Sequence, residues 1–470
     1  MKLIQARHTF VVVLLLIFAG ALYALVQTPA ANPQRARDIY RELVEINTVT
    51  ATGDTDKAAK AMAARLRTAG FSGNDVQAFT PVPRKGNLVA RLHGTGARRP
   101  ILLLAHLDVV EARREDWSSD PFTLLEKDGY FYGRGTSDDK YMAAAFVANL
   151  IRLKQEGFMP ARDIIVALET DEEILDENSL GIQWLLKNHR DLIDAEFALN
   201  EGANVGVRKD KVLRNSIQTS EKVSVNFRLE VKNAGGHSSV PNKDNAIYHL
   251  SEGLARLAKF DFPVVLNETT RAWLLKAGPL EDARTAADMK SAASATPSAD
   301  SVARLSAMPA YNAQIRTTCV TTMLDGGHAV NALPQIAGAN VNCRILPGES
   351  VDAVQKTLVR VLADGQISVT LKTKPVLSPP SPLNAEILQS VERLTNEFWP
   401  GIPVIPTMST GATDGAFLRN AGIPTYGHGG LASDIDDNRA HGKDERVSVK
   451  AFEQGVEYLY RLVKALSSGK

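Results

Sequence analysis

In the first half of the chain, short apolar runs alternate with segments whose apolar residues recur at helical spacing. The runs predict strands at 87–92, 101–105, 163–168 and 195–199, and the helical spacing predicts helices at 35–46, 57–69, 139–155 and 179–188. This alternation is typical of an α/β domain with a mostly parallel central sheet and helices on both faces. Chemistry in such domains is expected in the loops beyond the carboxyl ends of the strands.

From about Gln218 the pattern changes to that of a smaller α+β domain inserted into the first. Its predicted strands are 222–231, 315–322, 336–345 and 367–373, and its predicted helices are 245–257 and 351–362. An Ala- and Ser-rich segment, 281–307, predicts a surface excursion that is partly helical and poorly packed.

The Pro-rich stretch 375–382 predicts the linker that returns the chain to the first domain. An apolar strand near Ile423 and a final helix over 449–466 would complete that domain. The expected division is therefore 1–31 for an N-terminal segment, 32–217 and 377–470 for a catalytic domain in two parts, and 218–376 for an inserted lid.

Lys2, Arg7 and His8 precede an uncharged apolar run over 10–26. This pattern predicts a signal peptide or a short N-terminal membrane anchor, and therefore an exported, extracytoplasmic protein. The small residues at 19–21 offer a cleavage site, but the apolar run continues past them. Cleavage and retention both remain open.

Composition narrows the class of protein. The chain has 470 residues, of which 44% are hydrophobic and 23% charged, and a net charge of +1, so it lacks the basic field that nucleic-acid binding requires. Cys319 and Cys343 are the only cysteines. They exclude a disulfide scaffold, and two buried free thiols are the favoured interpretation over a bridge.

Two motifs place polar residues where apolar strands end. His106 closes the run "LLLAH" and is followed by Asp108, which is the arrangement of a zinc-ligating His with a carboxylate that fixes its tautomer. Asp138 and Asp139 follow a tight Gly turn just before a helix. One such carboxylate can bridge two cations. The alternatives are an ordinary loop pair for His106 and a helix N-cap for Asp138.

A third motif, "ETDEE", crowds four acids after another apolar strand. Packing like charges together costs energy unless cations or protons neutralise them, so one of Glu172 and Glu173 could ligate a metal while the other shuttles a proton. A solvated acidic loop is the alternative. Glu201 follows a fourth apolar strand, and His441 lies in the closing segment. Together, His and carboxylate ligands suit zinc without any thiolate.

The motifs "HLDVV", "GRGTSDDK", "TDEE", "NEG", "GGHSS" and the late "HG" stand in this order between about Ile39 and Ala465. With them the sequence resembles the aminoacylase and carboxypeptidase S family of co-catalytic zinc peptidases and deacylases. It is most similar to the branch that holds vacuolar carboxypeptidase S and the secreted N-acyl-amino-acid hydrolase. The resemblance implies the fold of a zinc-peptidase catalytic domain with a lid, or dimerisation-type, domain.

The resemblance also implies a role for each metal-site residue. His106 and Glu201 would hold one zinc, Glu173 and His441 the other, and Asp138 would bridge both. Two Zn²⁺ are expected, for which Co²⁺ or Mn²⁺ could substitute. Asp108 would orient His106, and the peptide bond from Asp138 to Asp139 would be cis. Glu172 would be the general base that activates the zinc-bound water.

In the lid, the resemblance implies that His237 stabilises the oxyanion and that Asn331 and Arg344 contact the substrate and its carboxylate. Glu201, where relatives that need a free amine carry Asp, favours N-acyl amino acids or peptides with a free C-terminal carboxylate. The alternatives are a dipeptidase that recognises a free amino group and a catalytically silent envelope binding protein. The chain is expected to act as a monomer, or as a homodimer through the lid.

Overall fold

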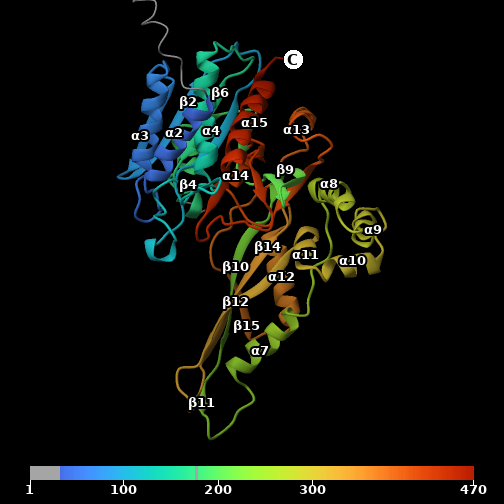
Figure 1. The fold of residues 1–470 in the computed structure, drawn as a ribbon. Coiled ribbons are helices and arrows are strands. Elements are labelled where there is room, and N and C mark those ends of the chain that lie inside the picture. Colours follow the sequence, from blue (N-terminus) through green and yellow to red (C-terminus); the bar gives the residue numbers. More distant parts are fainter. Residues whose placement is uncertain (1–31, 175–177, 470) are drawn as a thin grey trace, which may run out of the picture.

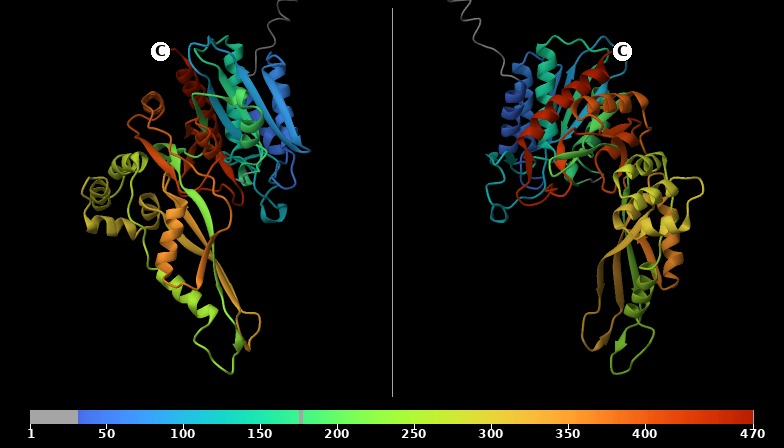
Figure 2. Two further views of the ribbon diagram at one scale, coloured as in Figure 1. Left: turned by 180° about the vertical axis from the view of Figure 1, so that it is seen from behind. Right: turned by 45° about the vertical axis from the view of Figure 1, so that its right-hand side comes forward.

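The computed structural model describes residues 32–174 and 178–469. An α/β domain carries an elongated lid that projects from one side of it (Figures 1 and 2). The expected signal peptide or anchor lies outside the described residues. Within the described ranges, no helix combines the length and the apolar character that crossing a membrane would need.

The α/β domain is built on a mixed sheet that has ten strands among the described residues. Nine of them follow one another across the sheet in the order β1-β2-β6-β3-β7-β17-β9-β8-β18, and β16 pairs with β9. The neighbouring strands β6, β3, β7 and β17 are parallel. The bounds of the strands are β1 (Val76–Val82), β2 (Lys85–Leu92), β3 (Ile101–His106), β6 (Ile164–Glu169), β7 (Phe197–Asn200), β8 (Val205–Arg208), β9 (Lys211–Glu221), β16 (Val404–Ser409), β17 (Thr425–Gly427) and β18 (Ala432–Asp434).

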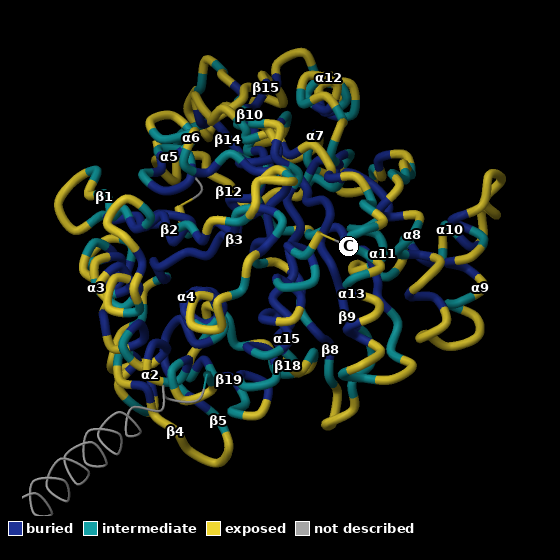
Figure 3. The backbone as a smooth tube through the Cα atoms, turned by 90° about the horizontal axis from the view of Figure 1, so that it is seen from above, coloured by how far each residue is buried: buried dark blue, intermediate teal, exposed yellow. Residues whose placement is uncertain are grey.

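Both faces of this sheet are covered, which explains why its central strands are continuous apolar runs. In β3, Ile101, Leu103 and Ala105 pack into one core and Leu102 and Leu104 into the opposite one, because successive side chains point to opposite faces. The first face is covered by α2 (Asn32–Glu45), α3 (Thr55–Thr68), α4 (Lys140–Gln155), α13 (Ala385–Phe398) and α15 (Val449–Ser467). The second is covered by α5 (Ile182–Asn188), α6 (Arg190–Ile193) and α14 (Gly415–Asn420). Figure 3 shows the buried backbone running through β2 and β3.

The remaining strands of the α/β domain form a small sheet beside the main one. It consists of β4 (Leu125–Lys127), β5 (Tyr130–Tyr132) and β19 (Arg446–Ser448), and β5 lies in the middle. Because β19 comes just before α15 and β5 just before α4, this sheet holds the closing segment of the chain against the segment that leads into α4.

The lid is an antiparallel four-stranded sheet with two helices packed on it. Its strand order is β12-β14-β10-β15, and its core is separate from those of the α/β domain. The elements are β10 (Val223–Lys232), α7 (Ala246–Leu257), β12 (Thr318–Gly326), β14 (Ile336–Ile345), α12 (Val351–Leu362) and β15 (Ile367–Leu371). A two-stranded ribbon of β11 (Gly236–His237) and β13 (Ala332–Leu333) forms its far tip.

The expectation of two free thiols was wrong, because Cys319 and Cys343 form a disulfide. They face each other directly on β12 and β14, with their Cα atoms 4.0 Å apart. Antiparallel pairing brings such opposed residues within reach of a bridge. The two cysteines meet because of the register in which β12 pairs with β14. Their separation of 24 residues in sequence does not indicate that register.

The expectation of a poorly packed excursion was also wrong. The chain between α7 and β12 folds into α8 (Glu268–Ala277), α9 (Ala283–Ala292), α10 (Ala299–Ser306) and α11 (Pro309–Ile315). These helices enclose a core of their own that includes Leu274, Met289 and Leu305. Ile405 of β16 belongs to the same core, so the helices pack against the α/β domain. Figures 1 and 2 show them clustered beside the junction with the lid.

Both connections to the lid meet at a buried ion pair. Glu221 is the last residue of β9, and a single residue separates it from β10 of the lid. Its carboxylate lies 2.5 Å from the guanidinium of Arg419. Ser378, on the returning connection, donates its hydroxyl proton to Glu221. All three side chains are buried. Because breaking a buried pair leaves an uncompensated charge, this contact ties the lid firmly to the α/β domain.

Candidate metal centre

The carboxyl ends of neighbouring parallel strands deliver the first site residues. His106 is the last residue of β3 and lies in register with Glu169, the last residue of β6. Glu201 directly follows β7. Glu172 and Glu173 lie in a single 3₁₀ turn, Glu172–Ile174, shortly after β6. The parallel arrangement explains why residues up to about a hundred positions apart in sequence converge on one edge of the sheet.

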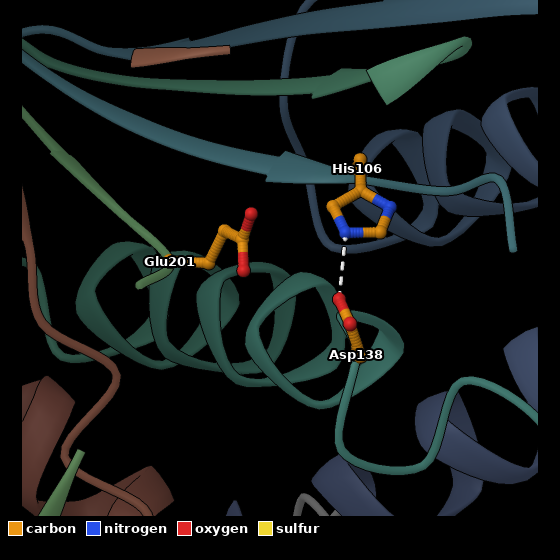
Figure 4. A group of neighbouring side chains, drawn as sticks. All are labelled: His106, Asp138 and Glu201. Atoms are coloured by element: carbon orange, nitrogen blue, oxygen red, sulfur yellow. Dashed lines mark hydrogen bonds and ion pairs between the residues drawn. The ribbon is translucent and has the colours of Figure 1, made fainter. Parts of the chain in front are cut away.

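Two groups of potential metal ligands share one carboxylate. His106, Asp138 and Glu201 form the first group, and Asp138, Glu173 and His441 form the second, with the ligand atoms of each group within 4.8 Å of one another. Figure 4 shows the first group, with Asp138, on the loop that leads into α4, facing the ring of His106. The Nε2 atom of His106 lies 3.0 Å from Oδ1 of Asp138, and Nε2 of His441 lies 3.0 Å from Oδ2. Asp138 therefore presents one oxygen to each group.

The backbone fixes the ring of His106. Its Nδ1 atom lies 2.9 Å from the backbone carbonyl oxygen of Asp108, which can only accept a hydrogen bond. Nδ1 therefore carries the proton, and the lone pair of Nε2 faces Asp138 in the neutral ring. The side-chain carboxylate of Asp108 is 3.7 Å from Nδ1, which is too long for a hydrogen bond.

The carboxylate of Asp108 instead holds the turn that carries the two glutamates. It accepts hydrogen bonds from the backbone N–H groups of Glu172 and Glu173, both at 3.2 Å, and from the hydroxyl of Thr50 at 3.1 Å. Through its carbonyl and its carboxylate, Asp108 thus links the His106 ring to the turn of Glu172 and Glu173.

The electrostatics of the two ligand groups favour a bound cation. Burial, and next the neighbouring Asp138, raise the pKa of Glu201 well above its usual value, and burial together with Glu201 does the same for Glu172. Hydrogen bonds to Asp138 and Glu173 raise the pKa of His441 to about 10. Oε1 of Glu173 is buried and has no hydrogen-bond partner among the described residues. A donor set of two imidazoles and three carboxylates, with one carboxylate oxygen unsatisfied, fits divalent zinc.

The peptide bond between Asp138 and Asp139 is cis, as the family resemblance implied. Asp139 occupies the N-cap position of α4, but its side chain makes no capping hydrogen bond, so the helix-cap alternative does not explain the carboxylates of this motif. Adjacent acids in one motif therefore lie in different surroundings, one in the ligand cluster and one at the helix start.

Sequence reasoning missed Glu445, which anchors the Asp138 loop. Its buried carboxylate accepts hydrogen bonds from the backbone N–H groups of Gly135, Ser137 and Asp138 and from the guanidinium of Arg134 at 2.7 Å. Glu445 lies four residues after His441 in sequence, so one loop supplies a potential ligand and also fixes the carboxylate that the two groups share. The only sequence signal was an acid in the polar stretch "HGKDER".

The lid residues lie apart from this cluster. His237 is exposed in β11 at the lid tip, where its Nδ1 contacts the hydroxyl of Ser239. Asn331 lies beside it and accepts a backbone hydrogen bond from Ser238. The side chain of Arg344 is half-buried near the other end of β14, and its guanidinium makes no hydrogen bond or ion pair with any of the described residues. Within one chain, the structure brings together the five ligand residues and Glu172, but not the lid residues.

Comparisons with known proteins agree with this geometry. The profile of peptidase family M20/M25/M40 matches residues 102–465. The chain belongs to this family. Human N-fatty-acyl-amino acid synthase/hydrolase PM20D1 is 30% identical over 382 residues, covering 78% of this chain and 74% of the human protein. The probable carboxypeptidase S-like 2 of Dictyostelium discoideum is 28% identical over 398 residues, covering 78% and 71% respectively.

The fold of this M20 chain is also found in solved structures. The M20 family metallo-carboxypeptidase Sso-CP2 of Sulfolobus solfataricus superposes with a TM-score of 0.66 at 18% identity, covering 92% of this chain and 98% of that one. At this identity the likeness concerns the fold alone. The α/β fold with its lid and the family resemblance expected from the motifs are confirmed, and the chain is an M20 metallohydrolase of the peptidase or amidohydrolase type.

Substituting Glu445 by Gln should weaken metal binding in protein that circular dichroism shows to be folded, although the loss of the buried pair with Arg134 should also lower stability. The amide places an N–H₂ group against backbone N–H donors, so the Asp138 loop loses acceptors that hold it. Partners of this kind commonly change metal affinity by about 10- to 100-fold. Competition with a chromophoric chelator measures the affinity. Glu453→Gln, which alters a half-exposed ion pair with Arg37, is the control and should bind metal like the parent. Equal affinity for both variants would contradict the anchoring role.

Proposed function

We propose that the protein is a two-zinc hydrolase that cleaves the amide bond of N-acyl amino acids or peptides with a free C-terminal carboxylate. The observation that carries this proposal is the pair of ligand groups that share Asp138, with Glu172 beside them. The names of the M20 relatives, an N-fatty-acyl-amino acid hydrolase and a probable carboxypeptidase, support this substrate class.

His106 and Glu201 would hold one zinc and Glu173 and His441 the other, with Asp138 between them. When bound, the metal pair supplies Lewis acidity, which polarises the scissile carbonyl and makes a water molecule acidic near neutral pH. Co²⁺ or Mn²⁺ would fit the same oxygen and nitrogen ligands.

Glu172 is placed to move the proton. Its side chain is 7% exposed, and its backbone is fixed by Asp108. Burial and the acid neighbours that raise its pKa make it a better proton acceptor than a solvated carboxylate. Glu172 takes the proton of the attacking water and passes it to the leaving nitrogen, so the amine departs neutral and the new carboxylate carries the water oxygen.

The lid would recognise the other end of the substrate. The half-buried guanidinium of Arg344 has no ion-pair partner among the described residues, and it suits the free carboxylate because its planar fork can donate two parallel hydrogen bonds. Asn331 would contact the substrate, and His237 would donate to the oxyanion.

The strand β11, which carries His237, forms the tip of the lid, far from the α/β domain (Figure 1), and Asn331 is hydrogen-bonded next to it. We therefore favour a homodimer, in which the lid of one subunit serves the other, over a monomer. The edge strand β12 supports this arrangement: Val320, Met323 and Leu324 on it are each at least 60% exposed. Exposed apolar edge strands are surfaces for pairing.

The protein would be exported, as a periplasmic, secreted or membrane-anchored enzyme. The disulfide between Cys319 and Cys343 supports this location, because such bonds persist in oxidising compartments. The apolar run over 10–26 is a second, sequence-based support.

Glu172→Gln should abolish turnover while metal is retained. Glutamine keeps the shape of the side chain but cannot accept the proton, and a general base commonly contributes about 10²- to 10⁴-fold in rate. The measurement is hydrolysis of N-acetyl amino acids and of blocked and unblocked dipeptides, with metal content determined on the same samples. Glu115→Gln, at an exposed acid, is the control. Full activity of Glu172→Gln would exclude it as the base, and a strict need for a free amine would favour the dipeptidase.

Mixing two inactive variants tests the shared site. A His237→Ala chain keeps its base, and a Glu172→Gln chain keeps its lid His, so exchange of subunits should create one intact site in each mixed dimer. Random exchange would restore about one quarter of the parental activity. The control mixes His237→Ala with a chain that carries both substitutions, which supplies no His237. A mixture without activity would show that His237 does not act across subunits.

A further inference from the structure

A histidine in the lid lies between two carboxylates. His249 is on α7, and its side chain is 23% exposed. Its Nδ1 atom lies 2.6 Å from Oδ2 of Asp364, in the connection between α12 and β15, and its Nε2 atom lies 3.0 Å from Oδ1 of Asp244, just before α7. A neutral imidazole has a single N–H group, so only the protonated ring can donate to both carboxylates at once.

The neutral ring has a different partner within reach. The Nε2 atom of Gln366 lies 3.2 Å from Nε2 of His249 and 3.4 Å from Oδ1 of Asp244. When His249 loses one proton and keeps Nδ1–H toward Asp364, the lone pair on its Nε2 can accept a hydrogen bond from the amide of Gln366. The ring then donates nothing to Asp244. The cluster therefore has two hydrogen-bonding arrangements, and the proton on His249 selects between them.

Asp244 connects this cluster to the arm of the lid over residues 233–244, which carries His237. Its Oδ1 atom accepts a hydrogen bond from Nδ2 of Asn233 at 2.8 Å, which joins the two ends of the arm. The Oδ1 atom of Asn233 accepts in turn from the backbone N–H of Gly235 at 3.2 Å, directly before β11. Figure 1 shows β11 at the end of this arm. A chain of hydrogen bonds thus runs from the imidazole ring to the strand of His237.

The charged groups that face His249 set the pH range of this contact. The hydrogen bond to Asp364 raises the pKa of His249 above its ordinary value of 6.5, burial opposes the rise, and the hydrogen bond to Asp244 adds to it. Arg256 acts on Asp364 from the same helix. The elements packed on α7, which are α12, β10, β12, β14 and β15, bring no other described charged group within ion-pair distance of His249. Both hydrogen bonds from the charged ring are therefore present below the ordinary pKa, and one is lost as the pH rises through the higher pKa of the folded protein.

We propose that His249 is a positioning residue whose imidazolium clamps the arm that carries His237, and that loss of its proton releases this arm. The consequence for turnover rests on the proposed function, in which His237 donates to the oxyanion. Because Asp244 is 57% exposed, water screens the clamp, so the clamp changes the population of the ordered arm by about two- to fivefold. Turnover then depends on pH through a residue outside the metal centre.

Hydrogen–deuterium exchange of the full-length, zinc-loaded protein measures the clamp, with exchange times scaled to the intrinsic rate at each pH. In the parent, backbone protection of residues 233–244 should fall about two- to fivefold between about pH 6 and about pH 9. His249→Gln should show the lower protection at every pH, and Asp244→Asn should reduce the pH-dependent change. His93→Gln is the matched control, because His93 also lies between two carboxylates but in the α/β domain, and it should follow the parent.

Turnover of an N-acetyl amino acid tests the positioning role. The kcat of the parent should exceed that of His249→Gln by about two- to fivefold at about pH 6, and the ratio should approach one at about pH 9, where the parent is itself released. The KM should change little, because an oxyanion contact acts in the transition state.

Protection of the arm that does not depend on pH in the parent, or a His249→Gln variant that keeps the parental pH dependence, would overturn the clamp. A kcat ratio that is the same at both pH values would overturn the positioning role. If the zinc-loaded parent hydrolyses no N-acyl amino acid or peptide, the proposed function fails, whereas the exchange measurement still decides the clamp.

Discussion

Crowding of carboxylates around Asp138 is the constraint on which the rest of the structure depends. Glu172, Glu173 and Glu201 converge on it, at or near the buried edge of the central sheet. Like charges in a poorly solvated place repel one another, so the arrangement holds only if cations or protons compensate and the backbone keeps the groups in place. The anchoring carboxylate of Glu445 and the turn held by Asp108 both serve that second requirement.

The proposed site has two parts: the carboxylate cluster in the α/β domain, where the backbone must hold the groups in place, and the residues of the lid. The potential metal ligands come from strand ends and loops that are cross-linked within the α/β domain. The lid residues come from a separate sheet, tied to that domain through the buried pair of Glu221 and Arg419. A tip residue such as His237 is therefore carried by the lid as a whole.

The sequence predicted the part of the site that follows from strand periodicity. His106 and Glu201 stand where apolar runs end, and runs of this kind are recognisable because both faces of their strands are buried. The final helix was predicted from its amphipathic pattern and is observed as α15. The roles of the ligand residues and of Glu172 came from the family resemblance and stay proposals.

The sequence could not predict contacts between segments that lie far apart in the chain. Cys319 and Cys343 became partners only through the pairing of β12 with β14, and no local pattern records that register. The Ala- and Ser-rich excursion 281–307 has few large apolar residues, yet its Met289 and Leu305 join a small core with Leu274 of α8 and Ile405 of β16. Glu445 was missed for a similar reason, because its partners are backbone N–H groups about 310 positions away in sequence.

The most direct test of the shared carboxylate is the number of metal ions bound per chain. Inductively coupled plasma mass spectrometry on purified, metal-saturated protein should find two zinc ions in the parent, one after His441→Ala, and neither bound tightly after Asp138→Ala, because both sites lose a ligand at once. Circular dichroism on the same samples checks that each variant is folded. A folded parent that binds a single ion, or an Asp138→Ala variant that still holds two, would contradict the account.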